Sequence, residues 1–109
     1  MLNVIGAVVT AGLGLMGLIR PAAAAVFTSM APVGTLGVSE IRATYGGFFL
    51  ALGAYALWAM SPPVFTTLGI AWLGAAAGRA ISVIVDKSRE PKNLGGIAFE
   101  AAIGLLCIA

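Results

Sequence analysis

The sequence is poor in charged and redox-active residues, and these shortages limit what the chain can do. It has no histidine and a single cysteine, Cys107, which excludes an internal disulfide and a cysteine-cluster metal site. Only 9% of its 109 residues are charged, whereas a soluble domain has about 25%. The formal net charge of +2 is too small to indicate nucleic-acid binding. We therefore expect no metal, no cofactor and no nucleic acid, and little surface that can face water.

Apolar residues dominate instead, at 61% of the chain with a mean hydropathy of +1.07. A transmembrane helix needs roughly 20 consecutive apolar residues, with a range of about 17–25. Four stretches qualify, namely residues 2–19, 41–60, 64–85 and 91–109. The sequence therefore predicts an all-α membrane protein, with residues 1–109 forming one domain, a four-transmembrane-helix bundle.

Prolines and charges mark where these helices end. The first ends at Arg20-Pro21, and Ser61-Pro62-Pro63 is expected to form a turn that no helix crosses. Pro21 can open a short helix over residues 22–30, lying in the membrane interface between the first and second spans. The alternative is a re-entrant segment buried against the bundle. A charged loop over residues 86–92 joins the last two spans.

Small residues recur at spacings that place them on one face of a helix, where another helix can approach closely in lipid. The expected contact residues are Gly6, Thr10, Gly14, Ala43, Gly47, Ala54, Gly74, Gly78, Gly96 and Gly104. Because aromatic belts form at membrane interfaces, Trp58 and Trp72 are expected to face lipid or the interfacial zone.

Basic residues indicate the orientation in the membrane. Arg20, Arg42, Lys87, Arg89 and Lys92 all lie in or beside the first and third connections, which share one side of a four-span chain. Loops rich in Lys and Arg tend to be cytoplasmic. Both termini are therefore expected outside.

Two opposite charges lie within the last two spans. Arg79 is about 9 Å deep and Glu100 about 14 Å deep from the same side, at a rise of 1.5 Å per residue. The short loop makes these helices antiparallel neighbours, so an Arg79–Glu100 ion pair is expected. The expected intramembrane polar cluster consists of Glu40, Arg42, Tyr45, Arg79, Ser82, Asp86 and Glu100. Such a cluster either fixes helix register or forms a pocket for a substrate, lipid headgroup or proton.

The same residues carry a resemblance to a known family. The segments Ser39-Glu40-Ile41-Arg42-Ala43 and Tyr45-Gly46-Gly47, then Gly78-Arg79 with Ser82 and Asp86, and Glu100 in the last helix, resemble a family of small four-helix bacterial membrane proteins. That family is catalogued as a domain of unknown function. The likeness covers the second to fourth spans, and Lys87 stands where the family pattern leads us to expect glycine. The resemblance implies the fold and a bacterial inner-membrane location, but no activity.

Three classes of function remain open. The first is a non-catalytic accessory, assembly or scaffold component that acts through helix contacts with a membrane-protein partner or a second copy. It is favoured because a nucleophile–base pair needs Ser or Cys near His or Lys, and the only lysines, Lys87 and Lys92, lie in the loop. The second is a small oligomeric transporter, although the first span lacks the acidic residue of small multidrug exporters. The third is a lipid-binding protein that holds a headgroup at Arg42 and Arg79.

Overall fold

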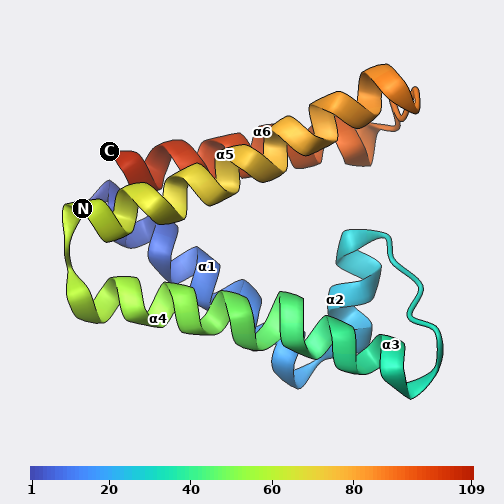
Figure 1. Cartoon of the computed structure of the whole chain (residues 1–109), viewed down its shortest axis with the longest axis horizontal. Coiled ribbons are helices and arrows are strands. Elements are labelled where there is room, and N and C mark those ends of the chain that lie inside the picture. The colour runs from blue at the N-terminus through green and yellow to red at the C-terminus, as the bar shows by residue number, and fades with distance from the viewer. The chain divides into compact units, whose positions relative to one another are not determined.

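The computed structural model describes all residues, 1–109, and every regular element in it is a helix (Figure 1). In chain order the helices are α1 (Leu2–Ile19), α2 (Pro21–Thr28), α3 (Gly34–Ile41), the π-helix η1 (Arg42–Phe48), α4 (Phe49–Ala59), α5 (Pro62–Val85) and α6 (Pro91–Ile108). The all-helical prediction is confirmed, and the expected short helix after the first span is present as α2.

Three helices are long and apolar enough to cross a membrane: α1, α5 and α6. They correspond to the first, third and fourth expected spans. The expected second span is not one uniform α-helix, because η1 interrupts it and leaves only eleven residues in α4. The backbone nevertheless stays helical at both junctions, with φ/ψ of −60°/−36° at Arg42 and −67°/−41° at Phe49.

The connection between α4 and α5 is shorter than the sequence suggested. Met60 has a positive φ of 48°, Ser61 is the N-cap, and Pro62 and Pro63 already belong to α5. Proline is well tolerated in the first turn of a helix, where its missing N–H has no intrahelical partner. The expectation that the two prolines form a turn outside the helix was wrong for that reason.

The chain falls into two compact units, residues 1–6 with 60–109 and residues 7–59, and each is described by itself. In the first unit α5 and α6 lie side by side and antiparallel (Figure 1). Their backbones touch: a Cβ on Gly69 would lie 2.6 Å from the carbonyl oxygen of Gly104. Trp72 packs edge-on against Phe99, with ring centroids 6.3 Å apart, and is only 7% exposed. The prediction that Trp72 faces lipid was therefore wrong.

In the second unit α1 packs against η1 and α4. A Cβ on Gly46 would lie 2.7 Å from the backbone nitrogen of Leu18, and one on Gly53 would lie 2.5 Å from that of Ala11. The predicted residue Gly14 does meet the facing backbone at Leu50. A small apolar core lies beside this crossing, where Ala24, Ala25 and Ile41 are buried and Met16 and Tyr45 pack against them.

Several of the predicted small residues make no helix contact within their own unit. Nothing lies within 4 Å of a Cβ built on Gly74 or Gly78, and Gly47 has only the Arg42 carbonyl oxygen, at 3.9 Å. The observed contact residue on α5 is Gly69. Every face of these helices is apolar, so the sequence does not distinguish the face that meets a helix from the face that meets lipid.

Candidate functional site

The centre of polar chemistry in the first unit is the ion pair between α5 and α6. The Arg79 Nε–H donates to Glu100 Oε1 at 2.7 Å, and Arg79 Nη1 donates to Asn93 Oδ1 at 3.2 Å. The Glu100 side chain is 12% exposed and that of Arg79 is 37% exposed. Asn93 in turn donates from Nδ2 to the Ser88 carbonyl oxygen at 2.9 Å. The predicted Arg79–Glu100 pair is confirmed, and its arginine has two partners on α6.

A glycine on α6 makes room for this arginine. A Cβ on Gly96 would lie 3.1 Å from both Cζ and Nε of Arg79, closer than ordinary side-chain contacts. Asn93, Gly96 and Glu100 are spaced by three and four residues, so they share one face of α6. The Arg79 guanidinium therefore lies over Gly96, between its two hydrogen-bond acceptors Asn93 and Glu100.

The predicted residues Ser82 and Asp86 form a separate polar link at the end of α5. Ser82 Oγ donates to Asp86 Oδ2 at 2.7 Å. Lys87 follows with a φ of +56°, a left-handed conformation that explains why glycine is expected there. At the start of α6, the Ser88 hydroxyl donates to Glu90 Oε2 at 2.7 Å and lowers the pKa of that carboxyl.

The remaining predicted site residues lie in the second unit. Arg42 donates from Nη1 to the Leu18 carbonyl oxygen, in the last turn of α1, where a cation compensates the free carbonyl groups of the helix end. The helix that carries Glu40 and Arg42 begins earlier than the predicted residue 41, because the helical backbone starts at Gly34.

Of the seven predicted residues, the structure therefore joins two pairs, Arg79 with Glu100 and Ser82 with Asp86. Both pairs belong to the first unit, whereas Glu40, Arg42 and Tyr45 belong to the second. The assembly of all seven into one cluster stays a prediction.

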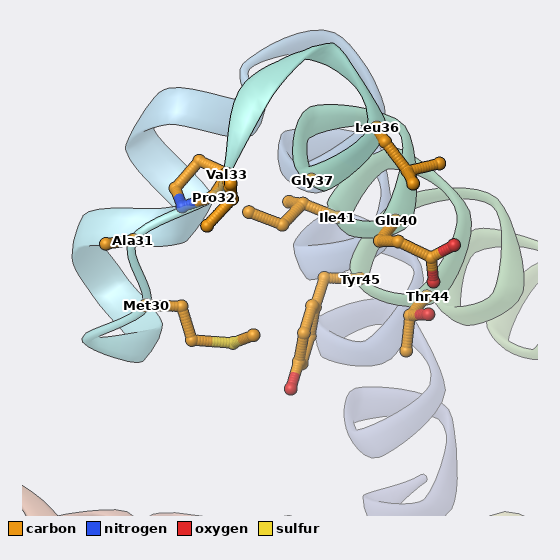
Figure 2. Close-up of a pocket in the computed structure, with 10 residues that line it drawn as sticks. All are labelled: Met30, Ala31, Pro32, Val33, Leu36, Gly37, Glu40, Ile41, Thr44 and Tyr45. Carbon is orange, nitrogen blue, oxygen red and sulfur yellow. The ribbon is translucent and has the colours of Figure 1, made fainter.

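A groove in the second unit was not foreseen as a site. It has a volume of about 570 Å³ and lies between the α2–α3 connection and the helix that begins at α3 (Figure 2). Its ten lining residues are Met30, Ala31, Pro32, Val33, Leu36, Gly37, Glu40, Ile41, Thr44 and Tyr45. Glu40 is the only charged residue among them.

The backbone of the connection shapes this groove. Ser29 ends α2 in the left-handed conformation, at φ 60°, and Gly34 starts α3 at φ +64°. Between them the chain folds down onto α3, where a Cβ on Gly37 would lie 2.9 Å from the carbonyl carbon of Pro32. The apolar connection broken by proline and glycine was the sequence signal for this feature. The signal for the missed Asn93 was its spacing of seven from Glu100.

Comparison with known proteins assigns the chain to a family. The model of one protein family, described as a domain of unknown function (DUF4345), matches residues 1–109, and the chain belongs to this family. No curated protein and no solved structure matches it. The match confirms the resemblance seen in the second to fourth spans and extends it over the first.

Proposed function

We propose that this member of the family is a four-span protein of the bacterial inner membrane that acts without catalysis. Its role is that of an accessory, assembly or scaffold component, and it works through contacts between its helices and those of a membrane partner or a second copy. The proposal has three supports: the helix lengths, the closed ion pair, and an open row of small residues on α5.

The fourth span in this proposal is the helix made of α3, η1 and α4. These elements have eight, seven and eleven residues and follow one another without a break in helical backbone. At 1.5 Å per residue they extend over roughly 39 Å, and the hydrocarbon core of a bilayer is about 30 Å thick. Glu40 and Arg42, both within its first ten residues, are the only charged residues of this helix. A span of this length and composition supports four crossings in place of three.

With four crossings, the basic connections lie in the cytoplasm and both termini lie outside. In a Cys107→Ser background, cysteines placed at Ser61 and Ser88 test this orientation. We expect the cysteine at 88 to label from the cytoplasm and the one at 61 from the outer side. The reverse pattern, or both labelling from one side, would contradict the proposed topology.

The ion pair supports a structural role for the buried charges. Arg79 already has Glu100 and Asn93 as partners at hydrogen-bond distance, and Gly96 provides the space for its guanidinium. A pair satisfied in this way fixes the register and rotation of α5 against α6. It is suited to holding the two helices together as one rigid unit.

The observation that carries the proposal is the row of small residues on α5 that α6 does not use. Thr67, Ala71, Gly74, Ala75 and Gly78 are all exposed, and a Cβ on Gly74 or Gly78 would meet nothing within 4 Å. The Thr67 hydroxyl donates to the Pro63 carbonyl oxygen at 2.8 Å, so it needs no outside partner. Two glycines four residues apart on an apolar helix allow another helix to approach closely.

The test compares association before and after this row is blocked. The tagged wild-type chain, a Gly74→Ile/Gly78→Ile variant and a Gly12→Ile control are purified in mild detergent and analysed for mass and composition. Gly12 is matched because it also has nothing within 4 Å of its Cβ. We expect a stable partner or second copy with the wild type and the control, and a loss of at least about tenfold in the double variant. Equal association of all three, or a monomer alone in all three, would refute the proposal.

A further inference from the structure

The groove in the second unit has two parallel rows of side chains contributed by one helix. Gly37, Ile41 and Tyr45 are four residues apart and form the floor, and Ile41 is 2% exposed. Leu36, Glu40 and Thr44 form the adjacent row, also four apart, and all three are exposed along the rim.

The opposite wall is the connection between α2 and α3. In Figure 2 the Met30 side chain extends toward Tyr45 from this wall, while Glu40 and Thr44 lie on the other side of the Tyr45 ring. The groove is therefore an apolar trough with a carboxylate and a hydroxyl beside each other along one rim. Its volume of about 570 Å³ lies within the range of about 300–1,000 Å³ found for ligand pockets.

Glu40 has no partner of its own. Its carboxylate forms no ion pair and no hydrogen bond with any other residue of the chain. No basic side chain lines the groove. A carboxylate beside an apolar surface favours a cation as its neighbour, and Thr44 adds a second hydrogen-bond acceptor. The Tyr45 ring favours a cation as well.

We propose that this groove binds a membrane phospholipid with a primary ammonium headgroup, the chemistry of phosphatidylethanolamine. The ammonium donates to the Glu40 carboxylate and the Thr44 hydroxyl, and part of an acyl chain lies along the floor over Ile41. Val33 and Leu36, on opposite sides of the groove in Figure 2, are 86% and 73% exposed, so the groove is open between them and a lipid can enter there from the bilayer. An anionic headgroup without an ammonium finds no cation in the groove and is disfavoured by the carboxylate.

The experiment measures lipid retention by native mass spectrometry. Delipidated wild-type chain is titrated in detergent with phosphatidylethanolamine or phosphatidylglycerol of identical acyl chains. Hydrogen bonds to charged groups change affinity by about tenfold or more, so we expect at least about a tenfold preference for phosphatidylethanolamine. The preference should disappear in Glu40→Gln and persist in Glu90→Gln, a matched acid that lies outside the groove.

A second variant tests the apolar part of the groove. Ala31→Trp adds a large side chain to one wall and should weaken retention of phosphatidylethanolamine without changing helicity measured by circular dichroism. Three results overturn the proposal: no preference in the wild type, a preference that survives Glu40→Gln, or an equal loss in Glu90→Gln. Retention of dodecylamine without phosphatidylethanolamine overturns it too, because the ligand is then a free amine and not a lipid.

Discussion

Replacement of Arg79 and Glu100, singly and together, tests how much their ion pair contributes to the free energy of unfolding. The variants are Arg79→Met, Glu100→Leu and the double variant. Each replacement removes a charge and introduces an apolar side chain with a high helix propensity. The two single variants should differ, because the two side chains differ in exposure and in their remaining partners.

Loss of Arg79 is expected to be the more damaging change. It leaves the Glu100 carboxylate, 12% exposed, without a cation, and we expect a cost of about 3 kcal/mol, at the low end for a broken buried pair. Loss of Glu100 leaves Arg79 37% exposed and still bonded to Asn93, and its long side chain can reach polar surroundings. We expect that loss to cost about 1 kcal/mol.

The double variant leaves no unpaired charge and should cost about 1 kcal/mol or less. The coupling between the two sites is then about 3 kcal/mol. Unfolding by denaturant in mixed micelles, followed by helicity, gives the free energy of unfolding of each variant. Ser82→Ala is the control, because it removes a polar side chain from the same helix without touching the pair. Strictly additive single effects, or an Arg79→Met variant as stable as wild type, would refute this account.

Three further predictions address packing and backbone geometry. Gly17→Ala should destabilise the chain by roughly 1–3 kcal/mol in micelle unfolding, because its Cβ collides with the Tyr45 backbone, whereas Gly12→Ala should be neutral or stabilising. Lys87→Gly should raise the free energy of unfolding by about 1 kcal/mol, because glycine adopts the left-handed conformation without strain; a decrease would contradict this. Brominated lipids should quench Trp58, which is 80% exposed, in a Trp72→Phe variant, and should quench Trp72 weakly in a Trp58→Phe variant.

The positions of most helices follow from the sequence because the bilayer and proline impose simple rules. The predicted spans 2–19, 64–85 and 91–109 agree with α1, α5 and α6 to within two residues. Apolar length sets the extent of such helices, and Arg20, the prolines and the charged loop set their ends. The pairing of Arg79 with Glu100 followed from the same rules, since a short loop fixes which helices are neighbours and at what depth.

The packing faces could not be derived in this way. In water, the apolar face of a helix is the buried face, but in lipid both faces are apolar and only small residues mark a contact. With 15 glycines in the chain, several rows satisfy that criterion equally. The predicted contact residue Gly104 faces Gly69 on α5, although the sequence pointed to Gly74 and Gly78 on that helix. Trp72 was misplaced for the same reason, since its contact with Phe99 depends on the rotation of α5.

The π-helix η1 is the main difference between the expected second span and the structure, and it also contributes residues to the groove. Ile41 and Gly46 are both buried but lie five residues apart, which on a regular α-helix would separate them by about 140° around the axis. An i→i+5 turn over Arg42–Phe48 brings them to one face, so that Ile41 meets Ala24 and Ala25 while Gly46 meets α1. No repeat of three, four or seven residues predicts this row. Thr44 and Tyr45, which line the groove, lie within this π-helix, in keeping with the frequent occurrence of π-helical turns at functional sites.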